Sequence, residues 1–159
     1  MSRILLISLK ICNGLLLIAG WAMALIAYPR LPSCILLWIN FFHQSPLRLE
    51  KNLAFFIYPF TQLILALVFS LVSLRPIIPA EIGNSKLRQK LNYLWQEQAW
   101  TALIFLNLIL IHLQRSLIFL SHGLKEGLQP TYFLILFVLL FLLIPAYRLR
   151  TKMEMSIYR

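Results

Sequence analysis

The chain has 159 residues, 60% hydrophobic and 13% charged, whereas a soluble domain has roughly 45–50% apolar and about 25% charged residues. This composition excludes an ordinary soluble fold, because one small core cannot bury so much apolar surface. The 15 lysines and arginines against five glutamates give a net charge of +10. Because these cations flank the apolar runs, we interpret them as orientation signals and contacts to anionic inner-leaflet lipids, and we expect no nucleic-acid partner.

Four apolar runs predict a single membrane domain, an all-α four-helix bundle. They cover residues 11–28, 53–74, 99–121 and 130–149. Each reaches the ~20 residues that a spanning helix needs, and the alternating pattern of barrel strands is absent from the sequence. Ala22 and Ala24 resemble a signal-peptide cleavage site, but the long apolar stretch before Lys10 favours an uncleaved first span.

The distribution of cations predicts the orientation. Ten lysines and arginines lie in the N-terminus, the middle loop and the C-terminal tail, and five lie on the other side. The positive-inside rule therefore predicts a multi-pass protein of a bacterial inner membrane with both termini cytoplasmic. Cys12 and Cys34 flank the first span, too far apart for a disulfide.

The middle loop carries a helical apolar stripe, formed by Leu87, Leu91, Leu94 and Trp95, with basic and amide residues elsewhere on the wheel. The pattern predicts a short basic amphipathic helix over residues 84–95, lying on the inner leaflet and running on into the third span. A plain interfacial anchor is the favoured interpretation, and a sensor of lipids or of a partner is the alternative.

The third span carries polar residues at intervals of seven, which is a heptad pattern. The stripe consists of Trp100, Asn107, Gln114 and Ser121, each of the first three followed three positions later by Leu103, Leu110 and Leu117. Buried amides hydrogen-bond across membrane helices, so we expect this helix to be central, packed against another span or another subunit. In the first span, Gly20 and Ala24 form a small-xxx-small pair that permits close helix approach.

His112 and Arg115 are ionisable residues in the same span, which are often functional. They lie one turn apart, about 60–140° around the helix from the amide stripe. The structural interpretation is that Arg115 snorkels to the outer interface and that His112 is hydrogen-bonded within the bundle. The functional alternative is a transport path that combines both with Asn107 and Gln114.

The outer side gathers the potential metal ligands of the chain, which are Cys34, His43, Glu50, His122 and Glu126. Histidine and carboxylate suit zinc, but neither an H-E-x-x-H nor a C-x-x-C spacing occurs in the sequence. Gly123 and Gly127 also loosen the helix there. We therefore interpret these as solvated loop residues, and expect no metal, no cofactor and no catalytic residues.

The loop after the first span begins Tyr28-Pro-Arg-Leu-Pro-Ser-Cys-Ile-Leu-Leu-Trp-Ile-Asn40. Over about residues 11–75 it resembles a bacterial membrane domain of unknown function, found at the N-terminus of immunity proteins against the sporulation-delaying toxin. The matching residues are Leu31, Pro32, Ile35, Asn40, Lys51 and Pro59. The departures are Leu36, Trp38, His43 and Pro46, which stand where the family has Pro, His, Gly and Asp. These replacements make residues 34–42 apolar, so we expect this run to sink into the outer interface, with Trp38 among the headgroups.

These patterns favour a non-catalytic membrane protein that acts through helix–helix contacts, as an accessory, immunity-like or assembly subunit. Its partner would be another membrane protein or a second copy of itself. The main alternative is a small oligomeric transporter or channel subunit that uses the polar third span. A metal-dependent membrane enzyme built on His43, His122 and Glu126 is the least favoured alternative.

Overall fold

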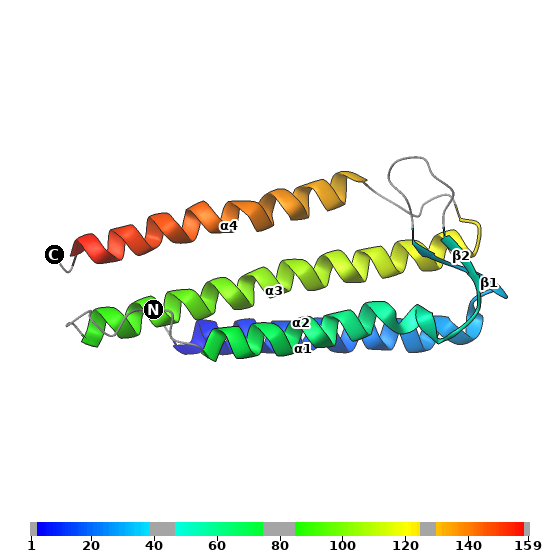
Figure 1. The fold of residues 1–159 in the computed structure, drawn as a ribbon, viewed down its shortest axis with the longest axis horizontal. Coiled ribbons are helices and arrows are strands. Elements are labelled where there is room, and N and C mark those ends of the chain that lie inside the picture. Colours follow the sequence, from blue (N-terminus) through cyan, green and yellow to red (C-terminus); the bar gives the residue numbers. More distant parts are fainter. Residues whose placement is uncertain (1–2, 39–46, 75–84, 125–129, 158–159) are drawn as a thin grey trace.

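The computed structural model describes residues 3–38, 47–74, 85–124 and 130–157. The described part contains four α-helices: α1 (Arg3–Ala27), α2 (Ile57–Leu74), α3 (Ser85–Ser121) and α4 (Pro130–Ile157). All four are long and apolar enough to cross a membrane, which confirms the predicted number of helices. They run alternately up and down one long axis, so the first and last described residues lie at the same end of the molecule (Figure 1).

Two of the helices extend beyond their predicted limits. α1 begins at Arg3 rather than at residue 11, because Leu6 packs against α3 in a cluster with Trp100 and Leu103. α4 ends at Ile157 rather than at residue 149. Charged residues that mark the edge of a hydrocarbon core do not end a helix, since their side chains reach water while the backbone ladder continues.

The predicted amphipathic helix over residues 84–95 is helical from Ser85 onward and runs on into the third span, as expected. The described part of that segment is the first third of α3, which continues without interruption for 37 residues. Leu87, Leu91 and Leu94 are buried against Leu143 and Tyr147 of α4. An apolar stripe at helical spacing fits a membrane surface and a neighbouring helix equally well, and here the neighbouring helix covers it.

α3 is the central element of the fold. α1 and α2 pack on one side of it and α4 packs on the other, where α4 makes nearly all its helix contacts (Figure 1). With a rise of 1.5 Å per residue, α3 is about 55 Å long, well over the ~30 Å of a hydrocarbon core. A spanning α3 therefore extends out of the apolar layer.

A short β-ribbon at the far end is an addition to the all-α bundle that the sequence predicts. β1 (Cys34–Trp38) pairs antiparallel with β2 (Leu47–Glu50), and short 3-10 turns at Tyr28–Arg30 and Leu53–Phe56 join the ribbon to α1 and α2. Ile35 is fully buried and Leu36 is 9% exposed. Protein therefore covers both residues, and the expected depth of this run at the outer interface stays a prediction.

Candidate functional site

A network of amide side chains joins α3 to α1 and α2. The Asn107 side chain is fully buried, and its Nδ2 donates to Oδ1 of Asn13 over 3.1 Å. Gln62 Nε2 donates to the backbone oxygen of Asn107 over 3.4 Å, and Asn13 Nδ2 donates to the backbone oxygen of Trp100 over 2.9 Å. The polar stripe of the third span is thus bonded to other spans of the same chain.

The remaining positions of the stripe follow the same face. Gln114 Nε2 donates to the backbone oxygen of Gly20 over 3.5 Å. A Cβ atom at Gly20 would collide with the side chain of Gln62, so this glycine allows the three helices to meet. Ala24, one turn on, is fully buried, and Ser121 Oγ accepts a hydrogen bond from the backbone N–H of Leu36 over 3.0 Å.

Asn13 and Gln62 are members of this network that the sequence analysis did not single out. Each is a strongly polar side chain inside an otherwise apolar run, and 4% and 0% of their surfaces are exposed. In a membrane helix, such a side chain needs a partner. An isolated amide in an apolar run therefore indicates from the sequence that the side chain is buried and bonded, but it does not indicate which helix supplies the partner.

The opposite face of α3 meets α4 through rings. The His112 ring lies 4.2 Å from the Tyr132 ring centroid and 4.9 Å from that of Phe133. His112 is buried, and its Nε2 has no hydrogen-bond partner among the described residues. His112 therefore faces α4, whereas Asn107 and Gln114 face α1 and α2.

Arg115 is exposed and lies between the face of α3 that packs on α1 and α2 and the face that packs on α4. Its guanidinium lies 4.9 Å from the ring centroid of Phe119, one turn toward the C-terminal end of α3. Helical side chains usually lean toward the N-terminus. The reversed direction is what a snorkelling arginine adopts near the end of a span.

Two ion pairs join α3 to α4 near the end that holds both termini. Arg150 Nη1 donates to Oε1 of Glu97 over 2.8 Å, and Glu97 is 6% exposed. Lys90 pairs with Glu154 over 2.5 Å. These ion pairs lie on either side of Leu91 and Leu94, so polar and apolar contacts alternate along this stretch of the α3–α4 interface.

The residues that carry the family resemblance have structural contacts. Leu31 and Ile35 belong to one buried cluster, Pro59 is fully buried in α2, and Pro32 is partly buried. Lys51 Nζ donates to the backbone oxygens of residues 29 and 31, over 3.2 Å in each case. Asn40, with the departures His43 and Pro46, lies outside the described residues.

The outer-side residues considered as metal ligands are only partly described, because His43 and Glu126 lie outside the described ranges. Both ring nitrogens of His122 face backbone oxygens, that of Ile118 at 2.8 Å and that of Arg30 at 3.0 Å. Within residues 3–38, 47–74, 85–124 and 130–157, no three potential ligands converge on a metal site. Cys12 and Cys34 are both free and exposed.

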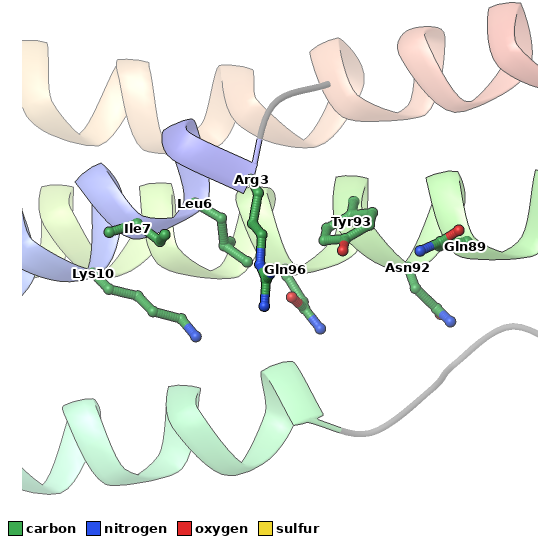
Figure 2. A pocket seen from close by; sticks show the side chains of 8 residues that line it. All are labelled: Arg3, Leu6, Ile7, Lys10, Gln89, Asn92, Tyr93 and Gln96. Carbon is green, nitrogen blue, oxygen red and sulfur yellow. The ribbon is translucent and has the colours of Figure 1, made fainter.

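A basic cavity of about 420 Å³ lies between the first turns of α1 and the beginning of α3. Its lining residues are Arg3, Leu6, Ile7 and Lys10 from α1 and Gln89, Asn92, Tyr93 and Gln96 from α3. Figure 2 shows the Arg3, Lys10 and Gln96 side chains directed into the same space. The lining combines two cations with neutral hydrogen-bonding groups and contains no carboxylate.

Comparison with known proteins identifies no relative: no protein-family model matches the sequence, and neither a curated protein nor a solved structure matches it significantly. The resemblance to the toxin-immunity family stays a prediction.

Proposed function

We propose that this chain is a non-catalytic membrane protein that acts through helix contacts with another membrane protein, as an accessory, immunity-like or assembly subunit of a bacterial inner membrane. One observation carries the proposal. Asn107 and Gln114, the amides of the polar stripe on the central helix, are buried against α1 and α2, and the exposed surfaces of α1, α2 and α4 carry mainly large apolar side chains.

α4 is the element we assign to partner contact. Among the described residues α4 packs almost entirely on α3, and its other side is a stripe of large apolar residues. Leu134 and Phe141, two helical turns apart, are 64% and 67% exposed. A partner helix beside α4 would gain packing on both α4 and the flank of α3, which is the main source of helix association in lipid.

Photo-crosslinking tests the proposal. A photoreactive amino acid replaces Phe141 in the full chain, expressed at native level in its host, and the same amino acid replaces Ile64 on the exposed face of α2 as the control. We expect a discrete adduct with one membrane protein from position 141 and only lipid adducts from position 64. Lipid adducts from both positions, together with a particle mass of one chain in mild detergent, would refute the proposal.

The transport alternative finds less support in the geometry. Asn107 and Gln114 face α1 and α2, whereas His112 faces α4, so these side chains do not line one path within a single chain. A clean homo-oligomer would revive this alternative. In that case Arg115→Leu and His112→Ala should each abolish flux and leave folding intact.

A further inference from the structure

We propose that the basic cavity between α1 and α3 binds the phosphate group of an anionic phospholipid. The inference depends on the chain spanning a membrane and is independent of the partner protein proposed above. The cavity lies where both helices leave their predicted apolar spans, since its α1 residues precede position 11 and its α3 residues precede position 99. That level corresponds to the headgroup layer of a bilayer.

The charges of the cavity suit a phosphate. Arg3 and Lys10 face it, and within the described residues the carboxylates of this end are engaged elsewhere, Glu97 with Arg150 and Glu154 with Lys90. Arg3 lies in the first turn of α1, which contains no acidic residue, so the positive end of that helix dipole adds to the field. A guanidinium and an ammonium on one side of a cavity form a typical phosphate-binding pair.

The neutral lining residues make the cavity more than a diffuse positive patch. The side chains of Gln89, Asn92, Tyr93 and Gln96 recur at i, i+3, i+4 and i+7 on one face of α3, opposite Arg3 and Lys10 on α1 (Figure 2). Amide and hydroxyl groups donate to phosphate oxygens. The amide oxygens of Gln89 and Gln96 in the same lining can accept a hydrogen bond from a headgroup hydroxyl.

The apolar part of the lining indicates a lipid rather than a soluble phosphate. Leu6 and Ile7 border the cavity, and exposed Ile11, Leu15 and Ile18 continue along α1 away from it, between 58% and 64% exposed. A phosphate held by Arg3 and Lys10 would therefore have its acyl chains beside an apolar helix surface. Phosphatidylglycerol has the anionic phosphodiester and the hydroxyls that this lining can recognise.

Native mass spectrometry of the full chain in mild detergent tests the proposal, with phosphatidylglycerol and phosphatidylcholine of identical acyl chains as probes. We expect one phosphatidylglycerol to be retained in preference to phosphatidylcholine, and millimolar inorganic phosphate not to displace it. Lys10→Gln and Gln96→Leu should each weaken retention about tenfold, the effect of one charge-assisted hydrogen bond. Arg88→Gln, which removes one cation from α3 outside the cavity, is the matched control.

Two results would overturn the proposal. If Arg88→Gln weakens retention as much as Lys10→Gln while Gln96→Leu has no effect, the binding is diffuse electrostatics without a site. If inorganic phosphate displaces the lipid and is itself retained, the ligand is a soluble phosphate. If Gln96→Leu prevents folding, Gln89→Leu replaces it, because Gln89 is an exposed residue of the same cavity. It should then weaken lipid retention in the same way.

Discussion

The two faces of α3 hold their neighbours by different means. Toward α1 and α2, the interface is built on buried amides and on the close approach at Gly20. Toward α4, it is built on rings and apolar side chains around His112 and Ile109 and, nearer the beginning of α3, on leucines interleaved with two ion pairs. Amide contacts have strict geometry and specify one arrangement, whereas the α4 interface depends on non-directional leucine contacts and on two ion pairs whose cations are partly exposed and screened by water. We therefore expect α1–α3 to form the stable unit and α4 to be the helix that detaches first.

The largest expected effect comes from Gly20→Ala. The added Cβ would collide with the terminal amide of Gln62, and this buried amide would have to move and give up its hydrogen bond to the backbone oxygen of Asn107. The free energy of unfolding should therefore fall by about 2–3 kcal/mol, from overpacking and the lost hydrogen bond together. Gly14→Ala is the matched control, because a Cβ there has nothing within 4 Å. Unfolding in mixed detergent and SDS micelles, followed by circular dichroism, measures both. Equal stabilities of the two variants would contradict the close approach at Gly20.

Asn107→Ala should cost about 2 kcal/mol, because it leaves the buried Asn13 without its side-chain partner. A double-mutant cycle with Asn13→Ala isolates the pair, whose coupling we expect at roughly 0.6–1.7 kcal/mol. The same unfolding assay provides all four values. A coupling of zero would show that the two amides do not stabilise each other.

Glu97→Gln weakens the α4 face and should cost about 1 kcal/mol, since its partner Arg150 is half exposed and screened by water. Hydrogen exchange resolved along the chain distinguishes the two faces. We expect faster exchange in α4 and unchanged exchange in α1 and α2. An equal increase in all helices would mean that the two faces unfold as one unit.

Arg115→Leu should have the smallest effect, within about 0.5 kcal/mol, because an exposed side chain away from both interfaces contributes little to stability. The unfolding assay again measures the change. A loss of stability as large as that of Asn107→Ala would contradict this prediction. It would indicate a structural partner of Arg115 other than Phe119, on which the guanidinium stacks.

The helix count and the central position of α3 were predictable from composition and period. Uninterrupted apolar runs of span length have few alternatives in lipid, and a heptad stripe of amides marks a helix with neighbours on that side. The position of His112 away from the amide stripe also follows from the helical wheel, whereas its contact with α4 does not. The roles of Asn13 and Gln62 were only partly predictable. An isolated amide in an apolar run indicates that the side chain needs a hydrogen-bond partner, but not which residue that partner is.

Other features depended on tertiary contacts. The stripe at Leu87, Leu91 and Leu94 predicts an amphipathic helix, yet only the position of Tyr147 shows that α4 covers it. Burial of Ile35 beside Ala24 and Phe55 likewise depends on the β-ribbon folding back over the bundle.

The sequence by itself determined which segments are helices long enough to span a membrane and which faces carry polar groups, because both depend on local spacing and on the cost of an unpaired polar group in lipid. Tertiary structure decided which helix satisfies each face, where the amphipathic segment lies, and that Arg3 and Lys10 meet Gln89 and Gln96 around one cavity. These are contacts between residues about 80 or more positions apart. Periodicity describes one helix at a time, so only packing brings such residues together.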